Sequence, residues 1–166
     1  KRWAAHNIIA SSFSYTQDKV GNRKTITLFG GGVITLGYDN IYELTSEVRT
    51  IANPYSITWG YDKVGNRQWQ IKNGVRTDYT CNDANQLVSE ITAGVTTDSV
   101  FDANGNMTVK KIGGVTVAQW GYDWENRQAS YTDLLNPLNN STYGYDAAGR
   151  RVSRTVNGVV EKYLLD

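Results

Sequence analysis

Cysteine, histidine, methionine and proline are nearly missing from this 166-residue sequence, which contains one, one, one and two of them. The single cysteine, Cys81, excludes a disulfide within the chain. Because His6 is the only histidine, a zinc site or a Cys–His nucleophile pair would depend on that one combination of residues. The sequence therefore predicts no catalytic residues, no metal site and no cofactor.

An excess of charge and a long hydrophobic run are missing too. The 17 basic and 16 acidic residues are scattered and leave a net charge of +1, so no basic stripe is available to follow a nucleic acid backbone. The longest apolar runs, such as Leu134-Leu135, fall far short of the ~20 residues that a transmembrane helix needs. The first residues lack the apolar stretch of a signal peptide, and we interpret them as the start of a fragment.

The residues that are abundant favour β-structure. The chain has 11 tyrosines and 16 glycines, many threonines and valines, and a hydrophobic fraction of 40%. β-Branched and aromatic residues are typical of strands, and glycine is typical of the tight turns that join them. This composition indicates a folded, β-rich chain rather than a disordered one.

An internal repeat runs through the whole sequence. Its pattern is an aromatic residue, any residue, Tyr, Asp, any two residues, and Gly or Asn, as in Trp59–Gly65 and Tyr143–Gly149. We call the Tyr position the marker and the acid or amide after it the anchor residue. The markers recur every 20 to 23 residues at Gln17, Tyr38, Tyr61, Cys81, Phe101, Tyr122, Tyr145 and Leu165. Such regular spacing predicts one structural unit per repeat.

Hydrophobic alternation within one unit predicts a hairpin. Between Arg67 and Cys81, around Asn73-Gly74, one alternating set contains Trp69, Ile71, Val75, Tyr79 and Cys81, which we expect on the half-buried face. The opposite set, expected to face solvent, contains Gln68, Gln70, Lys72, Arg76, Asp78 and Thr80. Asn-Gly supplies the positive φ angles of a two-residue turn.

Each unit is expected to contain a second turn inside the repeated pattern. In Asp62–Gly65 the Asp side chain can accept from the backbone two residues on, and Gly accepts a left-handed conformation. Tyr42 takes that glycine position in its own unit, and we expect strain or an altered turn there. The hairpin tips are expected at Gly31-Gly32, Ala93-Gly94, Gly113-Gly114 and Asn157-Gly158.

The two longest units hold the two prolines, in Asn53-Pro54 and Asn136-Pro137. Proline removes a ladder hydrogen bond inside a strand, so both insertions are expected at exposed hairpin tips. We predict residues 1–12 as a segment of uncertain pairing and residues 13–166 as a repeat region of about seven units. A β-propeller is an alternative, because two units match the length of a blade, but every unit carries the same pattern without the alternation of blade signatures.

Several segments resemble the Rhs/YD-repeat family, which includes Rhs polymorphic toxins, Tc toxin shell components, wall-associated proteins and teneurins. The resemblance is carried by Tyr61–Arg67, Phe101–Met107, Tyr122–Arg127 and Gly144–Arg151. It implies an all-β fold in which tandem antiparallel β-hairpin (YD) repeats form a spiral sheet or an arc of a β-shell. Three markers, Gln17, Cys81 and Leu165, depart from the tyrosine of the family pattern. The sequence also lacks an Asp-Pro-x-Gly motif, so the self-cleavage of toxin members is not carried over.

The repeated Tyr-Asp pair is interpreted as a structural anchor, since an active site needs one special arrangement rather than the same pair in every unit. Aromatics that recur at the same point of each repeat are expected to lie above one another in adjacent strands; the candidates are Trp59, Tyr61, Tyr79, Phe101, Trp120, Tyr122, Tyr143, Tyr145 and Tyr163. Asp102–Asn106 superficially resembles a calcium loop but lacks the downstream acid, and we interpret it as a turn. Arg23, Arg67, Arg127, Arg150 and Arg151 are interpreted as solvated charges near the anchors. The structural residues predicted for the repeat are its markers, anchor residues and turn glycines: Tyr38, Asp39, Tyr61, Asp62, Gly65, Phe101, Asp102, Gly105, Tyr122, Asp123, Tyr145, Asp146 and Gly149.

The resemblance implies a secreted or cell-surface repeat segment, not an enzyme, that forms part of a shell wall enclosing or presenting another domain, such as a toxin. Its partners would be neighbouring repeats or a C-terminal cargo domain of the parent protein, and its open sheet edges could pair with a second copy. The alternative is an adhesion module that binds carbohydrate or protein through repeated aromatics. Buried Trp59, Trp69 and Trp120 would favour the wall, whereas a contiguous exposed row would favour binding.

Overall fold

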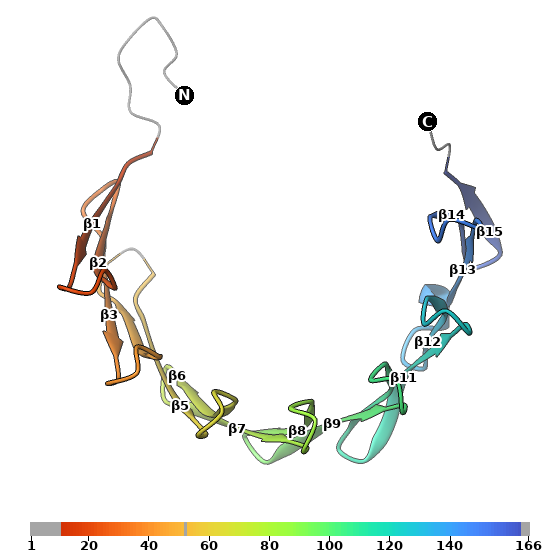
Figure 1. Ribbon diagram of the computed structural model, residues 1–166, viewed down its shortest axis with the longest axis horizontal. Helices are drawn as coiled ribbons and strands as arrows, with labels where there is room; N and C mark the ends of the chain where they lie inside the picture. Colours follow the sequence, from red (N-terminus) through yellow and green to blue (C-terminus); the bar gives the residue numbers. More distant parts are fainter. Residues whose placement is uncertain (1–10, 52, 164–166) are drawn as a thin grey trace, which may run out of the picture. The chain divides into compact units, whose positions relative to one another are not determined.

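A computed structural model describes residues 11–51 and 53–163, and the regular secondary structure of this part of the chain is almost entirely β-strand. Its fifteen strands form one antiparallel sheet in which the strand order follows the chain order (Figure 1). The predicted all-β fold of tandem antiparallel hairpins is therefore confirmed. His6, most of the N-terminal segment and the marker Leu165 lie outside the described residues.

The chain divides into two compact units between Asp78 and Tyr79. The division falls inside β7, and each unit is described separately. The strands of the first unit, with β7 at its end, are β1 (Phe13–Gln17), β2 (Arg23–Leu28), β3 (Val33–Tyr38), β4 (Leu44–Arg49), β5 (Tyr55–Tyr61), β6 (Arg67–Lys72) and β7 (Val75–Cys81).

The second unit adds eight strands and one short 3₁₀ helix, η1 (Pro137–Asn139), to the described part of the chain. The strands are β8 (Leu87–Thr92), β9 (Val95–Phe101), β10 (Met107–Ile112), β11 (Val115–Tyr122), β12 (Gln128–Asp133), β13 (Ser141–Tyr145), β14 (Arg151–Val156) and β15 (Val159–Lys162). The marker is the last residue of its strand at each described position, so every repeat contributes one strand that ends at the marker and one strand that follows it.

Two kinds of turn alternate along each unit. The tips at Asn73-Gly74, Ala93-Gly94, Gly113-Gly114 and Asn157-Gly158 have positive φ at both residues, as a primed two-residue turn requires. The predicted tip at Gly31-Gly32 is wrong by one residue. The positive φ angles fall on Gly30 and Gly31, and the amide of Leu28 donates to the carbonyl of Gly32 at 2.7 Å. A four-residue loop therefore replaces the two-residue turn, because three consecutive glycines allow either.

Both proline insertions lie in exposed loops between strands, as predicted. Pro54 directly precedes β5, and Pro137 begins η1 in the loop between β12 and β13. The side chain of Asn136 accepts from the amide of Leu138 and caps this short helix. Proline fits both places because neither requires its missing amide hydrogen.

The predicted assignment of faces in the hairpin around Asn73-Gly74 is wrong. The register pairs Lys72 with Val75 and Gln70 with Thr77, and residues directly opposite one another share a face. A two-residue turn therefore exchanges odd and even positions between β6 and β7. Trp69 shares its face with Arg76 and Asp78, whereas the buried Thr77 shares the opposite face with Gln70.

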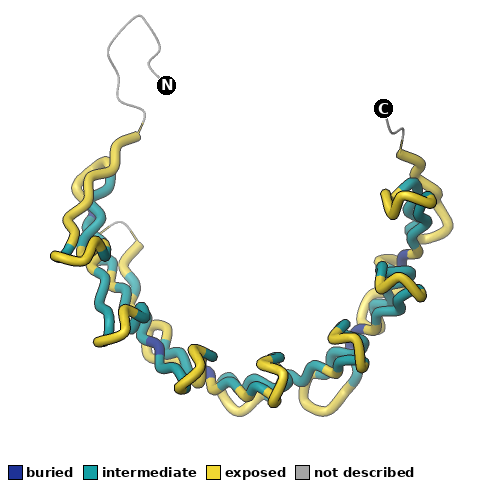
Figure 2. The backbone as a smooth tube through the Cα atoms, viewed as in Figure 1, coloured by how far each residue is buried: buried dark blue, intermediate teal, exposed yellow. Residues whose placement is uncertain are grey.

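Burial is shallow in both units because the sheet has a single layer. Among the described residues the buried hydrophobic side chains are Trp59, Val117 and Ala118, and no large side chain is fully buried. Figure 2 shows intermediate residues along most of the strands and exposed residues at the turns. The two faces of each unit are therefore left without a packed second layer in this part of the chain.

Tyr42 occupies a position where glycine or asparagine is preferred, with φ of 69°. The turn keeps its backbone hydrogen bonds, so the sequence correctly predicted strain but an altered turn did not result. We expect Tyr42→Gly to stabilise the first unit by about 1 kcal/mol, because the left-handed conformation costs a bulky residue roughly this amount. Chemical denaturation would measure this change, with the exposed Tyr163→Gly as the control. A loss of stability in Tyr42→Gly would contradict the prediction.

Candidate functional site: the anchor turns

The repeated feature with the most defined geometry is a five-residue turn that begins at the anchor residue, which we call the anchor turn. In the first unit, Asp62 Oδ1 accepts from the backbone amides of Val64 and Asn66, both at 2.9 Å. The amide of Asp62 donates to the carbonyl of Asn66, and the amide of Gly65 donates to the carbonyl of Asp62. One carboxylate oxygen thus satisfies two backbone donors that the strand ladder leaves unpaired. The same pattern of side-chain acceptance recurs at Asp18, Asp39, Asn82, Asp102, Asp123 and Asp146.

The fifth residue of the turn, which we call the closing residue, is matched to its anchor. Asparagine amides at Asn22, Asn66 and Asn106 donate to the second carboxylate oxygen of their anchors, each at 3.0 Å. Arg127 and Arg150 donate through Nε to Asp123 and Asp146, each at 2.8 Å. Where the anchor is an asparagine the direction reverses, and Asn82 donates to Gln86 at 2.7 Å. The anchors were predicted from the sequence, but these partners four residues later were not.

These hydrogen bonds favour the charged form of the anchor carboxylates. Donation from the Asn106 side chain, followed by its backbone amide, lowers the pKa of Asp102. The pKa values of Asp18, Asp62, Asp123 and Asp146 are lowered as well. A carboxylate held in this state is a strong acceptor and a poor proton donor, which suits a turn rather than general acid catalysis.

Neighbouring anchor turns contact one another in the second unit. The amide groups of Asn104 and Asn106 donate to Oδ1 of Asn126 at 2.9 and 3.1 Å. Arg127 in the next turn donates to the carbonyl of Asp146 at 3.4 Å, and its guanidinium lies 4.8 Å from the ring centroid of Tyr145. Polar side chains therefore join three successive turns of this unit, those that begin at Asp102, Asp123 and Asp146.

The marker tyrosines donate to the neighbouring strand. Their hydroxyl groups reach the backbone carbonyl of the first residue in the strand before: Tyr61 to Leu44 at 2.8 Å, Tyr122 to Met107 at 3.0 Å, and Tyr145 to Gln128 at 2.8 Å. A phenylalanine or cysteine at the marker, as at Phe101 and Cys81, has no such hydroxyl. The tyrosine thus secures the end of one strand to the start of its neighbour.

We expect Tyr122→Phe to destabilise the second unit by about 1 kcal/mol, because it removes one hydrogen bond and leaves the carbonyl of Met107 without its donor. The reverse change, Phe101→Tyr, should add a hydroxyl at the same point of another repeat and stabilise the unit by a similar amount. Urea unfolding of both variants and of the double variant measures this. Equal stability of Tyr122→Phe and the original chain would contradict the assignment.

The predicted stack of markers from repeat to repeat is wrong. Markers end every second strand, and neighbouring strands lie about 4.8 Å apart, so successive markers are about 10 Å apart and beyond ring contact. Ring contacts form between neighbouring strands instead, as between Trp120 and Tyr131, whose centroids are 5.4 Å apart. Arginine also lies over aromatic rings, with Arg23 over Tyr15 at 4.5 Å.

The arginines near the anchors are therefore more than solvated charges. Arg67 lies over Trp59 at 5.8 Å, and Arg151 lies between Tyr143 and Tyr163 at 5.5 and 5.3 Å. Arg127 is paired with Asp123 at 2.8 Å and with Glu125 at 2.5 Å. Cation–π and ion-pair contacts of this kind add modest stability and cover the rings from water.

The residue before the marker is a second feature of the site that was not predicted from the sequence. Four of these residues are glycine, and a Cβ atom at any of them would collide with the side chain directly opposite. At Gly121 and Gly144 the collision is with the hydroxyls of Ser130 and Ser153, at 2.5 Å. At Gly37 it is with Ser46, and at Gly60 with the indole of Trp69. Where the position holds a larger residue, the partner changes too, since Val100 pairs with Val109, and Thr16 pairs with Thr25.

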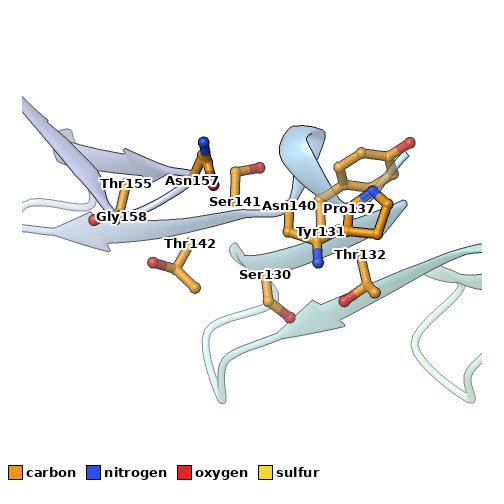
Figure 3. Close-up of a pocket in the computed structure, with 10 residues that line it drawn as sticks. All are labelled: Ser130, Tyr131, Thr132, Pro137, Asn140, Ser141, Thr142, Thr155, Asn157 and Gly158. Atoms are coloured by element: carbon orange, nitrogen blue, oxygen red, sulfur yellow. The ribbon is translucent and has the colours of Figure 1, made fainter. Parts of the chain in front are cut away.

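Two shallow hollows flank β12 and β13 in the second unit, where the strands share just two residue pairs. One has a volume of about 390 Å³, and the residues that line it include Ser130, Thr142, Asn140 and Pro137 (Figure 3). The other has a volume of about 420 Å³ and contains the rings of Trp120, Tyr131 and Tyr143 beside Gln128 and Arg154. Asn140 joins the loop to the sheet, because its side chain accepts from the amide of Asp133 at 2.7 Å.

The described residues contain no group of three or more side chains placed to hold a metal ion. The Asp102 carboxylate, which the calcium-loop pattern would require, accepts from Asn104 and Asn106. Cys81 is a half-buried free thiol at a marker position. Within residues 11–51 and 53–163, no helix has the length and hydrophobicity to cross a membrane.

The hairpin pairs, the markers that end every second strand and the anchor turns define a tandem β-hairpin repeat. No family model matches the sequence. Over 115 residues the chain is 31% identical to the tRNA nuclease WapA of Bacillus subtilis strain 168, a match that covers 66% of this chain and 4% of that protein. The resemblance to Rhs/YD-repeat proteins predicted from the anchors is confirmed.

Solved structures of Tc toxins have the same fold. A Tc holotoxin pore from Photorhabdus luminescens matches with a TM-score of 0.70 at 17% identity, over 90% of this chain and 9% of that chain. A TcdB2-TccC3-TEV structure matches with a TM-score of 0.72 at 18% identity, over 92% of this chain and 10% of that chain. The chain thus spans about a tenth or less of each of these proteins.

Proposed function

We propose that this chain is a wall segment of an Rhs-type shell, belonging to an exported or cell-surface protein that encloses or presents another domain. The observation that carries the proposal is the likeness to Tc toxin chains over 90% of this chain. The single-layer sheet supports it, because a wall needs two accessible faces and no thick core. Trp59, 8% exposed, favours the wall, although Trp69 and Trp120 are half-buried rather than buried.

The wall would act by steric exclusion rather than by catalysis. The anchor residues named from the sequence are proposed to serve as turn formers, because the same arrangement recurs at seven described anchors with its carboxylate or amide oxygens already accepting from the protein. Residues 13–166 are proposed as the repeat region. The proposed partners are neighbouring repeats and a C-terminal cargo domain of the parent protein.

Peptide mapping of the native gene product, followed by limited proteolysis, tests this function. We expect a product hundreds of residues longer than this chain, with a distinct domain that resists protease until denaturant opens the shell. A wall variant, Gly60→Val, should expose that domain to protease at lower denaturant than the original protein, while Glu161→Gln should not. A native product that ends near Asp166, or a domain cleaved equally in all variants, would overturn the proposal.

The terminal strands β1 and β15 are proposed to pair with further strands. Every residue of both strands is exposed, and among the described strands each has one neighbour in the sheet. Unpaired strand edges recruit other strands, so the isolated 166-residue chain should self-associate as its concentration rises. Sedimentation velocity across a hundredfold concentration range measures this, and a strictly monomeric chain at high concentration would contradict it.

A second candidate function, binding of carbohydrate or protein by an adhesion module, is favoured by the aromatic hollow of Trp120, Tyr131 and Tyr143. Its volume of about 420 Å³ lies in the usual range of ligand sites. Titration with neutral oligosaccharides, followed by tryptophan fluorescence, tests it. Trp124 is 88% exposed and does not line this hollow, so Trp124→Ala is the control. Binding that is lost in Trp120→Ala but kept in Trp124→Ala would favour the adhesion module. No response in any titration would remove the carbohydrate form of this function.

A further inference from the structure

One anchor turn of the first unit has an acid as its closing residue, where five other turns with an Asp anchor have a side-chain donor. In this turn the anchor is Asp39 and the closing residue is Glu43, another acid. The backbone pattern is intact, since Asp39 Oδ1 accepts from the amides of Ile41 and Glu43, both at 2.9 Å. At the equivalent position Asn22, Asn66, Asn106, Arg127 and Arg150 all donate to the anchor. A glutamate can donate there only when it carries a proton.

The next turn increases the negative charge around Glu43. A Cβ atom at Gly65 would lie 3.4 Å from Glu43 Oε1, so this carboxyl group lies against the turn that begins at Asp62. The acidic groups acting on Glu43 are Asp39 in its own turn and Asp62 in the next one. Desolvation and then the charge of Asp39 raise the pKa of Glu43, and a hydrogen bond with Asp39 and the charge of Asp62 act in the same direction.

The same turn also contains the strained Tyr42, with φ of 69° where the neighbouring turn has Gly65. Two departures from the repeated pattern thus coincide in one turn. An acid at the closing position and a tyrosine at the glycine position each weaken this turn. The turn at Asp39 should therefore open more readily than the turn at Asp62.

We propose that the Asp39–Glu43 turn is an acid-strengthened latch between β3 and β4, which closes when Glu43 is protonated and donates to Asp39, and loosens when Glu43 is ionised. The proton replaces the amide or guanidinium hydrogen of the other turns, and no covalent bond changes. The latch does not depend on the wall function, because it requires only that the first unit folds as described.

The direction of the pH effect follows from linkage. A folded-state pKa above the ordinary 4.5 means that the folded turn binds the proton more tightly than the unfolded chain does. The stabilising contribution is therefore fully present below about pH 4.5 and is lost as the pH rises through the folded pKa of Glu43.

Hydrogen exchange of the turn amides tests the latch on the full 166-residue chain. After correction for intrinsic rates, exchange at Ile41 and Glu43 relative to Val64 and Asn66 should increase by about threefold or more between pH 4.5 and 7.5, because the stabilising contribution of protonated Glu43 is lost over this range. In Glu43→Gln, whose amide donates at every pH, this ratio should stay constant and low. The control Glu161→Gln changes the charge equally on an exposed strand and should keep the original dependence.

Direct titration of the Glu43 carboxyl carbon by NMR makes the test independent of whether Glu43→Gln folds. We expect the midpoint above the ordinary value of 4.5, moving down in the Asp39→Asn variant. A pH-independent exchange ratio in the original chain, or a Glu43 midpoint at or below 4.5, would overturn the latch.

Discussion

Gly60→Val should destabilise the first unit by about 2 kcal/mol or more, which makes it one of the two largest expected effects. The Cβ of any larger residue at position 60 would overlap the indole ring of Trp69, including its Cζ2 atom at 2.7 Å. The ring covers the glycine and also contacts Arg76, whose guanidinium lies 5.2 Å from its centroid. Pushing it aside strains β6 and exposes the ring, and overpacking of this kind typically costs 1–3 kcal/mol. Urea unfolding monitored by tryptophan fluorescence measures the loss.

Residue pairs at the equivalent position of other repeats suggest control variants for Gly60→Val. Val100 and Val109 form the equivalent pair in the second unit, so the double variant Gly60→Val/Trp69→Val should recover part of the stability that Gly60→Val loses. Trp69→Ser, which copies the Gly–Ser pairs at Gly121 and Gly144, should be tolerated better than Gly60→Val. Strictly additive effects in the double-mutant cycle would mean that positions 60 and 69 are not coupled.

Asp102→Ala should lower the melting temperature by about 5 °C or more, because the turn loses the acceptor for the amides of Asn104 and Asn106. Asp102→Asn keeps the accepting oxygen, as Asn82 does in the preceding anchor turn, and should cost much less. Thermal unfolding by circular dichroism measures both variants. Equal melting temperatures for the Ala and Asn variants would show that the side-chain oxygen does not hold the turn.

Replacement of Asp102 should also change how the stability of the chain depends on pH. Hydrogen bonds from Asn106 lower the folded-state pKa of Asp102 below its ordinary value of 3.8. The stability from this carboxylate is therefore present above about pH 4 and is lost as the pH falls through the folded pKa. Between pH 5 and pH 2 the original chain should lose more stability than Asp102→Asn, and an identical acid dependence of the two would contradict this.

The features of the anchor turns that could be predicted from the sequence are those that depend on the local preferences of single residues. The turn at Asp62 followed from the residue types, because Asp and Gly have local preferences that do not depend on the rest of the fold. The closing residue Asn66 was missed since asparagine, arginine, glutamine and glutamate share no residue-type pattern. What they share is the position, four residues after the anchor, and the signal that could have revealed it is the matching of Arg127 to Asp123 and of Gln86 to Asn82.

The pairing across strands was harder to predict than the turns. The alternation of Trp69, Ile71 and Val75 along the sequence is misleading, because a two-residue turn exchanges odd and even positions between β6 and β7. The coupling of Gly60 to Trp69 depends on register, which includes an irregularity between Gly60 and Tyr61. An extra residue in one strand shifts all later pairs, and the conformational preferences of the local residues do not predict where it occurs.

The sequence by itself determined the repeat, the strand content and the turn positions, since these follow from the 20- to 23-residue spacing and the local preferences of Asp, Asn and Gly. Only the tertiary structure decided which side chains meet, as at Tyr122 and Met107 or at Gly60 and Trp69. The physical reason is that a turn is stabilised within five residues, whereas a face and a cross-strand partner depend on the register of two strands.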